Sequence, residues 1–367
     1  MPPDRIALVH ERFTEVAGSE EVVKALNLEW PHADVHAPIA RPSGVPGDMS
    51  GVPVTGWLNR FYDALGQRSY APLLPLMPAA FRTMKIKRYD AVVVSHHAFA
   101  TQAVFATDAP VVAYVHSPAR WAWDPTLRAG EGGGRVGAAI LTSLAAVARR
   151  CETSAAPKLH AVVANSSAVA ERVKQWWGRE ATVVHPPVDT VNYTPDPSIR
   201  REEFFLLAGR LVPYKRPDIA VRAAAAADVP LIVAGDGRAM RVCRQLAGPR
   251  TTFLGRLPRD TLVDLHRRAR ALLMPGVEDF GIVPVESMAT GTPVIALGEG
   301  GAMDTVVPGS TGMHITPGAD DDVVDRFAAA MRAFDVDDYD PGEIRRWATG
   351  FSESTFRQRM REVIDAI

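Results

Sequence analysis

The sequence predicts an α/β protein built from two Rossmann-like domains, each with a doubly wound parallel sheet. Short apolar runs rich in Val, Ile and Ala alternate with helical patterns along the chain. These runs show little alternation between apolar and polar residues, which is typical of parallel strands covered on both faces. The strand–helix pattern occurs in both halves of the 367 residues, a length that suits two domains.

The first half contains the first set of strand–helix units. Residues 6–10 predict a buried strand, and residues 20–30 predict the helix that follows it. Ser19 is the expected N-cap of that helix, and two acidic residues lie in its first turn. Further strands are expected at 91–95, 111–115, 161–164 and 182–184.

The second half repeats the pattern. Its strands are expected at 204–208, 231–234, 252–254, 271–274 and 294–296. Its helices are expected at 217–227, 238–246, 259–269 and 283–290. The last segment, residues 343–367, predicts two helices with Gly350 between them.

The domain boundary is expected within residues 188–201, which contain two prolines and little periodicity. We assign residues 1–190 to the N-terminal domain and residues 191–350 to the C-terminal domain. Residues 351–367 are expected to form a helix that packs back on the N-terminal domain. Two such domains face a central cleft at the carboxyl ends of their strands, where ligands of open α/β sheets bind.

Charge and cysteine content exclude several classes of protein. Lys and Arg number 41 and Asp and Glu number 42, so binding of nucleic acid through bulk positive charge is not expected. Two cysteines, Cys151 and Cys243, exclude a disulfide scaffold and a cysteine-rich metal centre. The apolar stretch 136–148 is too short to cross a bilayer. We therefore expect a soluble, cytoplasmic protein.

The strongest functional motif is residues 276–296, which follow a predicted strand and open a helix. Glu278 lies on the loop, where its carboxylate can reach a ligand hydroxyl. Glu286 lies eight residues later, in the first part of the helix, where it can reach a second group such as a ribose diol. The alternative is that both glutamates only complement the helix dipole.

The residues between the two glutamates suit an anionic ligand. Phe280 and Gly281 precede the helix, and Gly281 permits close approach of a ligand to the backbone. The helix start at Ile282 and Val283 presents unpaired N–H groups that suit a phosphate.

A second motif, residues 208–218, follows another predicted strand. Arg210 and Lys215 project from its loop, and two cations at the carboxyl end of a strand suit a diphosphate. The alternative is a solvated basic turn.

The segments GRLVPYKR and EDFGIVPVESMATGTPVIA resemble the donor-site motifs of family-4 retaining glycosyltransferases, which have the GT-B fold. The resemblance covers nearly the whole chain and is strongest over residues 203–316. It implies that Glu278 contacts the donor sugar and that Glu286 holds the ribose hydroxyls. It also implies that Arg210 and Lys215 clamp the diphosphate.

The resemblance extends to the first half. The segment AGSEEVV, residues 17–23, is similar to the family's glycine loop, which places Gly18 where the backbone meets the donor phosphate. Ala17 and Ser19 depart from the family pattern, so a two-glycine turn is not expected. The segment FLGRL occupies the position where family members hold the nucleobase, which implicates Leu254, Gly255 and Arg256.

The segment YVHSPARWAWD, residues 114–124, resembles a segment of bacterial mannosyltransferases in this family. The resemblance implies that His116 faces the donor sugar. The alternative is a structural histidine at a strand end. The implied catalytic set is therefore His116, Glu278, Arg210 and Lys215, with no metal and no cofactor.

Other motifs are assigned to structure. Asn165 and Ser166 are expected to cap a helix. The pattern Gly132-x-Gly134-x-x-Gly137 matches a dinucleotide fingerprint, but no strand precedes it. The acidic run 335–338 is expected to be a loop rather than a metal site, and His96 and His97 are expected to point to opposite faces of a strand.

Residues 56–88 are rich in aromatic, Leu and basic residues. Trp57, Phe61 and Leu65 are spaced for one helix face, and a basic cluster follows. We favour the interpretation that these apolar residues are core and the cations solvated. The alternative is peripheral contact with anionic lipid on the inner face of the cell membrane.

Taken together, these features imply a retaining glycosyltransferase that moves a hexose from a nucleotide-sugar donor to a lipid-linked or glycan hydroxyl. The resemblance of residues 114–124 favours mannose from GDP-mannose, and a UDP-sugar is the alternative donor. An epimerase or phosphorylase of the same fold and a non-catalytic nucleotide-sugar-binding protein remain the rival classes.

Overall fold

The computed structural model describes residues 3, 5–128 and 134–367. The chain divides into two units, which are Met1–Pro187 with Ser354–Ile367, and Val188–Glu353. We call them the N-terminal unit and the C-terminal unit. The fingerprint at residues 132–137 begins outside the described residues.

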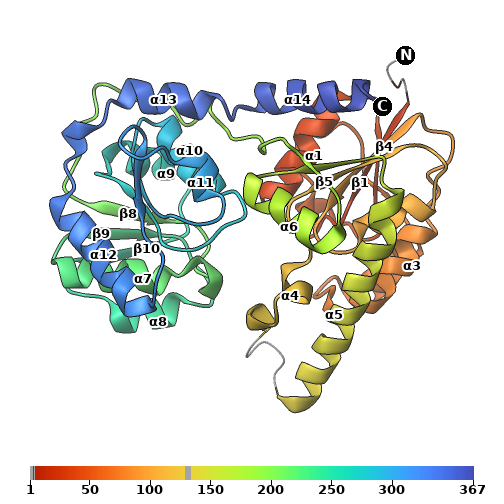
Figure 1. Ribbon diagram of the computed structural model, residues 1–367, viewed down its shortest axis with the longest axis horizontal. Coiled ribbons are helices and arrows are strands. Elements are labelled where there is room, and N and C mark those ends of the chain that lie inside the picture. Colours follow the sequence, from red (N-terminus) through yellow and green to blue (C-terminus); the bar gives the residue numbers. More distant parts are fainter. Residues whose placement is uncertain (1–2, 4, 129–133) are drawn as a thin grey trace. The chain divides into compact units, whose positions relative to one another are not determined.

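The N-terminal unit is a seven-stranded parallel sheet in the order β3-β2-β1-β4-β5-β6-β7, with helices around it (Figure 1). Its strands are β1 (Ile6–His10), β2 (Asp34–Ala37), β3 (Val54–Thr55), β4 (Ala91–His96), β5 (Val111–Val115), β6 (Ala161–Ala164) and β7 (Thr182–Val183). Its α-helices are α1 (Gly18–Glu29), α2 (Trp57–Ala64), α3 (Met77–Arg82), α4 (Arg120–Trp123), α5 (Arg135–Ala155), α6 (Ser167–Trp177) and α14 (Glu353–Asp365). Its 3-10 helices are η1 (Pro42–Gly44), η2 (Ala71–Leu76), η3 (Ala100–Phe105), η4 (Pro125–Arg128) and η5 (Ala156–Lys158).

The C-terminal unit is a six-stranded parallel sheet in the order β10-β9-β8-β11-β12-β13. Its strands are β8 (Phe205–Ala208), β9 (Leu231–Ala234), β10 (Thr251–Gly255), β11 (Leu272–Met274), β12 (Val294–Leu297) and β13 (Gly312–Ile315). Its α-helices are α7 (Pro217–Ala227), α8 (Met240–Leu246), α9 (Arg259–Arg268), α10 (Ile282–Ala289), α11 (Ala302–Thr305), α12 (Asp320–Ala333) and α13 (Pro341–Thr349). Its 3-10 helices are η6 (Pro213–Lys215) and η7 (Val336–Asp338).

The central strands of both sheets are buried on both faces, which agrees with the predicted fold class of two doubly wound parallel sheets. In β1, Ala7 and Val9 pack into one apolar cluster, and Ile6 and Leu8 pack into a second. Successive side chains of a strand point to opposite faces, so each strand contributes to two cores. The same division occurs in β8, where Phe205 belongs to one cluster of the C-terminal unit and Leu206 to the other.

The final helix, α14, completes one core of the N-terminal unit. Phe356, Met360 and Ile364 are buried in the same cluster as Ile6 and Leu8. These three residues are four apart, which places them on one face of the helix. The polar side of α14 contacts α1, because Arg357 and Arg361 both pair with Glu29.

One predicted cap was wrong. Ser19 is not the N-cap of α1, because the helix begins at Gly18 and Ala17 is the N-cap. The Glu20 carboxylate accepts hydrogen bonds from the Ala17 backbone N–H and from the Ser19 hydroxyl. The side chain of Glu20, three residues after the N-cap, therefore accepts the hydrogen bond at the start of the helix, and the Ser19 hydroxyl does not cap it.

The prediction for Ser166 was correct. It is the N-cap of α6, and its hydroxyl accepts a hydrogen bond from the Val169 N–H. Asn165 does not cap this helix, since its side-chain amide donates to the carbonyl of His116 at 2.8 Å. Asn165 instead ties the end of β6 to the end of β5.

Candidate functional site

The glutamate loop joins β11 to α10 in the C-terminal unit. Gly281 is the N-cap of α10 and has a φ of 88°, which L side chains rarely adopt. A Cβ atom at this position would lie 2.8 Å from Cε of Met274. The chain therefore requires glycine here for its backbone conformation, because the flexible end of the Met274 side chain can move to make room for a Cβ. The following N–H groups of α10 open the helix, where an anion is favoured.

Lys215 and Glu278 form an ion pair. The Lys215 Nζ atom donates to Oε1 and to Oε2 of Glu278, each at 3.0 Å. The two loops meet closely because Gly276 has no side chain, and a Cβ there would lie 2.5 Å from the Lys215 backbone. The structure thus places together two residues that lie 63 positions apart and that the sequence assigned to one site.

Arg210 joins the same site. Arg210, Lys215, Glu278 and Val283 line a single pocket at the carboxyl ends of β8 and β11. The side chain of Arg210 is exposed, whereas Lys215 and Glu278 are largely covered. An exposed guanidinium and a partly buried ammonium can hold the two phosphates of a diphosphate, the first by bidentate contact and the second as a point charge.

Glu286 lies in an environment that disfavours its charge. Burial and then the Asp189 carboxylate raise the pKa of its carboxyl, Arg259 and Lys215 oppose the shift, and the net pKa is about 7. Asp189 and Arg259 are themselves paired at 3.5 Å. A carboxyl whose pKa lies near neutrality can either donate or accept a hydrogen bond from a diol.

The remaining residues predicted in the C-terminal unit differ in exposure. The ring of Phe280 is buried against Phe351, with 5.7 Å between the ring centroids, so only its backbone faces the loop. Ile282 and Val283 are half-buried at the start of α10. At the nucleobase position, Leu254 and Arg256 are exposed, and the carbonyl of Gly255 accepts a hydrogen bond from the Gly235 N–H at 2.7 Å.

In the N-terminal unit, His116 follows the last residue of β5. Its ring stacks on that of His97, with centroids 4.5 Å apart and an interplanar angle of 11°. Burial is the main cause that lowers the pKa of His116 to about 3. His116 is therefore an uncharged imidazole near neutral pH. Gly18, the other predicted residue of this unit, opens α1.

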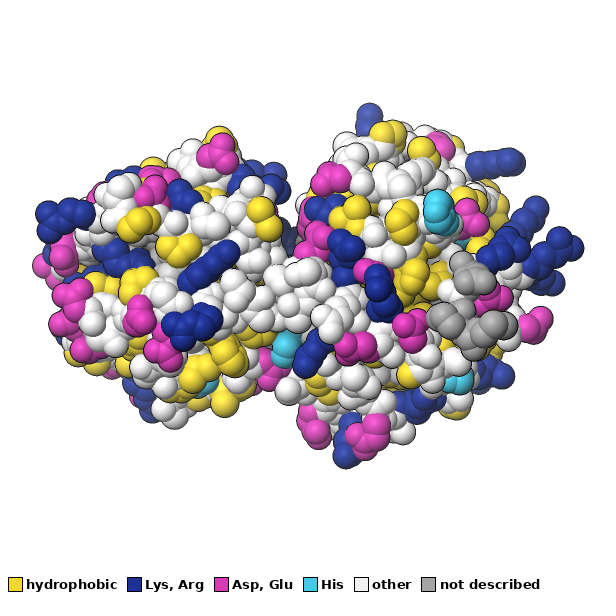
Figure 2. Space-filling view, turned by 90° about the horizontal axis from the view of Figure 1, so that it is seen from above, with side chains coloured by type: hydrophobic (Ala, Val, Ile, Leu, Met, Phe, Trp, Pro, Cys, Tyr) yellow, Lys and Arg dark blue, Asp and Glu magenta, His cyan; other side chains and the backbone are white. Residues whose placement is uncertain are grey.

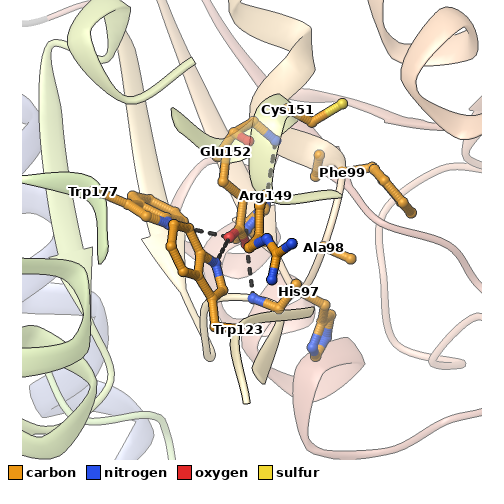
Figure 3. Close-up of polar contacts among 12 residues, drawn as sticks. His97, Ala98, Phe99, Trp123, Arg149, Cys151, Glu152 and Trp177 are labelled. Atoms are coloured by element: carbon orange, nitrogen blue, oxygen red, sulfur yellow. Dashed lines mark hydrogen bonds and ion pairs between the residues drawn. The ribbon is translucent and has the colours of Figure 1, made fainter. Parts of the chain in front are cut away.

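Sequence reasoning missed Glu152, which organises the segment after β5 (Figure 3). This fully buried carboxylate of α5 accepts from the Ala119 N–H at 2.7 Å and from His96 Nε2 at 3.0 Å. Its other oxygen accepts from Nε1 of Trp123 at 2.5 Å and of Trp177 at 3.2 Å. Four donors satisfy the buried charge, so Glu152 anchors the loop that carries His116.

Two arginines hold the same loop by its backbone. Arg149, which also lies on α5, donates to the carbonyl of Ala122 at 3.0 Å. Arg128 donates to the carbonyls of Trp121 and Ala122. These contacts fix the backbone of residues 121 and 122.

The interpretation that Trp57, Phe61 and Leu65 belong to the core was wrong. These side chains are 38%, 55% and 46% exposed, while the next residues along the same spacing, Leu58 and Tyr62, are buried. Helix α2 is apolar on two adjacent stripes, and the stripe that begins at Leu58 packs inward.

The basic cluster lies beside this exposed stripe. The Trp57 Nε1 atom donates to the Thr83 hydroxyl at 3.0 Å. Thr83 lines a groove of about 660 Å³ together with Arg82, Lys85, Lys87, Arg88 and Phe105, among others. On the face shown in Figure 2, basic, acidic and hydrophobic side chains are interspersed. Within the described residues, we found no helix with the length and apolar character needed to cross a membrane.

Two protein families match the chain. Residues 18–192 match the family described as "Glycosyltransferase Family 4", and residues 195–333 match "Glycosyl transferases group 1". The two matched segments leave only the chain ends and a two-residue gap uncovered.

Curated relatives are similar to part of the chain. A D-inositol 3-phosphate glycosyltransferase of Nocardia farcinica is 32% identical over 189 residues, which are 42% of this chain and 41% of the relative. A protein of the same description from Mycolicibacterium gilvum is 38% identical over 154 residues, which are 35% of this chain and 34% of the relative. The chain thus spans about two fifths of the length of the curated relatives it matches.

Solved structures share the whole fold. Anabaena HepE in complex with UDP superposes with a TM-score of 0.70 at 18% identity, over 99% of this chain and 100% of that chain. The sucrose-phosphate synthase of Thermosynechococcus elongatus superposes with a TM-score of 0.68 at 18% identity, over 98% of both chains. At 18% sequence identity, these superpositions show a common fold.

Proposed function

We propose that the chain is a family-4 glycosyltransferase with the GT-B fold, because residues 18–192 and 195–333 match two glycosyltransferase families, and that it transfers a hexose from a nucleotide diphosphate donor to a hydroxyl acceptor with retention of configuration. The observation that carries this proposal is the convergence of Arg210, Lys215 and Glu278 beside the amino end of α10. Two cations and a helix start provide fixed positive charge for a diphosphate. A carboxylate beside them provides an acceptor for sugar hydroxyls.

In the proposed reaction, the acceptor hydroxyl attacks the donor sugar from the face on which the diphosphate leaves. Arg210, Lys215 and the N–H groups at the start of α10 stabilise the charge that develops on the diphosphate, the contribution expected to be largest. Glu278 and His116 orient the sugar, and Glu286 binds the ribose. Binding of the diphosphate to Lys215 displaces part of its contact with Glu278, which then becomes free to bind the sugar.

We propose GDP-mannose as the donor, on the resemblance of residues 114–124 to bacterial mannosyltransferases. A UDP-sugar is the second candidate, because a structural neighbour of the same fold, Anabaena HepE, is described in complex with UDP and with UDP-glucose. In both cases we propose that no metal or cofactor takes part, because fixed cations and a helix start meet the diphosphate.

We propose that the acceptor is a lipid-linked or glycan hydroxyl and that the N-terminal unit rests on an anionic membrane. Trp57, Phe61 and Leu65 expose apolar surface beside the basic groove. Apolar side chains flanked by cations favour shallow insertion among anionic headgroups.

The proposal is tested by donor binding followed by product analysis. Thermal unfolding is measured with GDP, UDP, ADP and their sugar conjugates, without added metal, because a ligand that binds only the folded protein raises the melting temperature. A rise in melting temperature only with GDP and GDP-mannose supports the mannosyltransferase proposal. A rise only with UDP and its sugars shows that the donor is a UDP-sugar instead. No shift with any nucleotide overturns the donor site.

A matched pair of variants tests the site itself. Lys215→Ala removes the diphosphate contact, and Lys174→Ala makes the same change at an exposed lysine of α6. Transfer should be lost only in Lys215→Ala, with both variants folded. Product analysis by NMR separates transfer to a hydroxyl from transfer to free phosphate, from epimerisation and from binding without turnover.

A further inference from the structure

A chain of buried hydrogen bonds runs through the N-terminal unit from Glu20 to His116. The Glu20 Oε1 atom lies 3.2 Å from Nε2 of His10. The Nδ1 atom of the same His10 ring lies 3.0 Å from the Ser95 hydroxyl. That hydroxyl lies 2.8 Å from Nε2 of His116. All four side chains are at most 9% exposed, so the chain is closed to water along its length.

The sheet order explains how this chain arises. Strands β1, β4 and β5 are neighbours, and His10 pairs in register with Ser95 at their carboxyl ends. His116 follows the last residue of β5, and α1 starts close by and carries Glu20. Three adjacent strand ends and one helix start therefore meet at the edge of the sheet where ligands of this fold bind.

The donor and the acceptor of each hydrogen bond in this chain can be assigned, starting from Glu20. Burial alone would raise the pKa of Glu20, but the contacts of its carboxyl with His10, Ser19 and the backbone outweigh burial and lower it. The Ala17 N–H and the Ser19 hydroxyl donate to its Oε2 atom. Glu20 is therefore an ionised acceptor, and Nε2 of His10 must donate to it.

The same assignment extends through Ser95 to His116. In uncharged His10, the proton on Nε2 leaves Nδ1 as an acceptor, so the Ser95 hydroxyl donates to His10. The Ser95 oxygen in turn accepts from Nε2 of His116. A second proton on His10 would reverse both contacts and leave the proton of His116 on Nδ1, so the tautomer of His116 distinguishes the two arrangements.

We propose that Glu20, His10 and Ser95 are positioning residues that hold His116 as its Nε2–H tautomer and present Nδ1 as a hydrogen-bond acceptor for a substrate hydroxyl. Among the described residues, Nδ1 of His116 has no hydrogen-bond partner within the protein. The stacked ring of His97 fixes the plane of the imidazole. The assignment of the hydroxyl to the donor sugar rests on the proposed function.

The tautomer can be measured without any substrate. In protein labelled with ¹⁵N-histidine, long-range proton–nitrogen correlations distinguish a protonated ring nitrogen from an acceptor, and His116→Gln identifies the signal of His116. Wild-type protein at neutral pH should show the Nε2–H form of His116. Glu20→Gln should give a mixture of both tautomers, because an amide can either donate to or accept from His10.

Variants at Glu21 and Ser95 serve as controls for the tautomer measurement. Glu21→Gln makes the same change one residue along α1, at a partly exposed side chain that pairs with Lys24, and should leave the His116 signals as in wild type. Ser95→Ala should also mix the tautomers, while Ser95→Thr, which keeps the hydroxyl, should restore the Nε2–H form. An Nδ1–H form in wild type, or an unchanged tautomer in both Glu20→Gln and Ser95→Ala, overturns the proposal.

A binding experiment links the tautomer to the sugar. Ser95→Ala should weaken binding of the nucleotide sugar about tenfold, the effect of one lost hydrogen bond, while binding of the nucleoside diphosphate alone is unchanged. If Ser95→Ala weakens binding of the nucleotide sugar and of the nucleoside diphosphate equally, the positioning role is contradicted. If no nucleotide binds even wild-type protein, the proposed function fails, while the tautomer measurement still stands on its own.

Discussion

Replacement of Glu286 by Gln should stabilise the C-terminal unit above neutral pH and weaken donor binding. The pKa of this carboxyl is raised from 4.5 to about 7, chiefly by burial and then by the Asp189 carboxylate. At about pH 8 the folded protein must therefore hold a charge in a site that disfavours it. Glutamine removes that charge, and it also removes the acceptor that we assign to the ribose.

The magnitude follows from the two pKa values. The folded state binds more protons than the unfolded state between pH 4.5 and about 7, so the contribution of this group to stability is fully present below pH 4.5 and is lost as the pH rises. The complete loss corresponds to at most about 3 kcal/mol. Partial exposure of Glu286 to solvent brings the expected value closer to about 2 kcal/mol.

The assay is denaturant unfolding from about pH 4.5 to about pH 8 for wild-type protein, Glu286→Gln and Glu343→Gln. Glu343 is an exposed glutamate of α13 in the same unit and serves as the matched control. The stability of Glu286→Gln relative to wild type should rise by about 2 kcal/mol across this range, whereas Glu343→Gln should stay parallel to wild type. A constant difference between Glu286→Gln and wild type across the whole range would refute the reasoning, because packing effects of the amide do not depend on pH.

Three further predictions concern acid stability, backbone strain and the membrane. Burial lowers the pKa of the fully buried His266 to about 3, so stability should fall as the pH drops from about 7 to about 5, and His266→Leu should reduce that loss by about 2 kcal/mol in the same unfolding assay. Gly300→Ala should lower the melting temperature more than Gly309→Ala, because both glycines have positive φ but only at position 300 would a Cβ lie 2.5 Å from the backbone oxygen of Glu278. Equal losses would contradict a packing role for Gly300. In sedimentation with anionic vesicles, Phe61→Ser should reduce binding while Val52→Ser, at a site 88% exposed outside α2, should not; equal binding of both variants would argue against α2 as the contact.

The fold was predictable because its strands are buried on both faces. Each predicted strand and helix in the two doubly wound halves has a counterpart whose ends lie within two residues. The strands that the pattern missed are short and interrupted by polar residues, such as β2 with the sequence DVHA and β13 with GMHI. Their strand structure depends on pairing with neighbours, which a local apolar count does not capture.

The donor-site residues were predictable for a different reason. Lys215 and Glu278 each lie just after a strand, and the carboxyl ends of adjacent parallel strands meet. Glu152 could not be found in this way, because it lies within a helix and its partners are contributed by a loop and two tryptophans. No periodicity marks a buried carboxylate whose four donors converge only after folding.

The apolar pattern of α2 illustrates the limit of helical periodicity. Trp57 and Phe61 form one stripe, and Leu58 and Tyr62 form another, one residue further on. Both stripes satisfy the spacing of an amphipathic helix, so the sequence does not decide which one packs inward. The tertiary fold decides it, because only Leu58 and Tyr62 enter the cluster around β1 and β4.

The C-terminal site combines several features that lower stability. Gly281 has a backbone conformation with positive φ, Lys215 and Glu278 are partly buried charges, and Glu286 has its pKa raised to about 7. Each would be removed by an ordinary apolar substitution if stability alone were selected. Their occurrence together in the segments that follow β8 and β11, at the carboxyl ends of buried central strands, is typical of a ligand-binding site. The rigid sheet offsets these local costs, and we expect the donor ribose to hydrogen-bond to Glu286 and the donor diphosphate to neutralise the charge of Lys215.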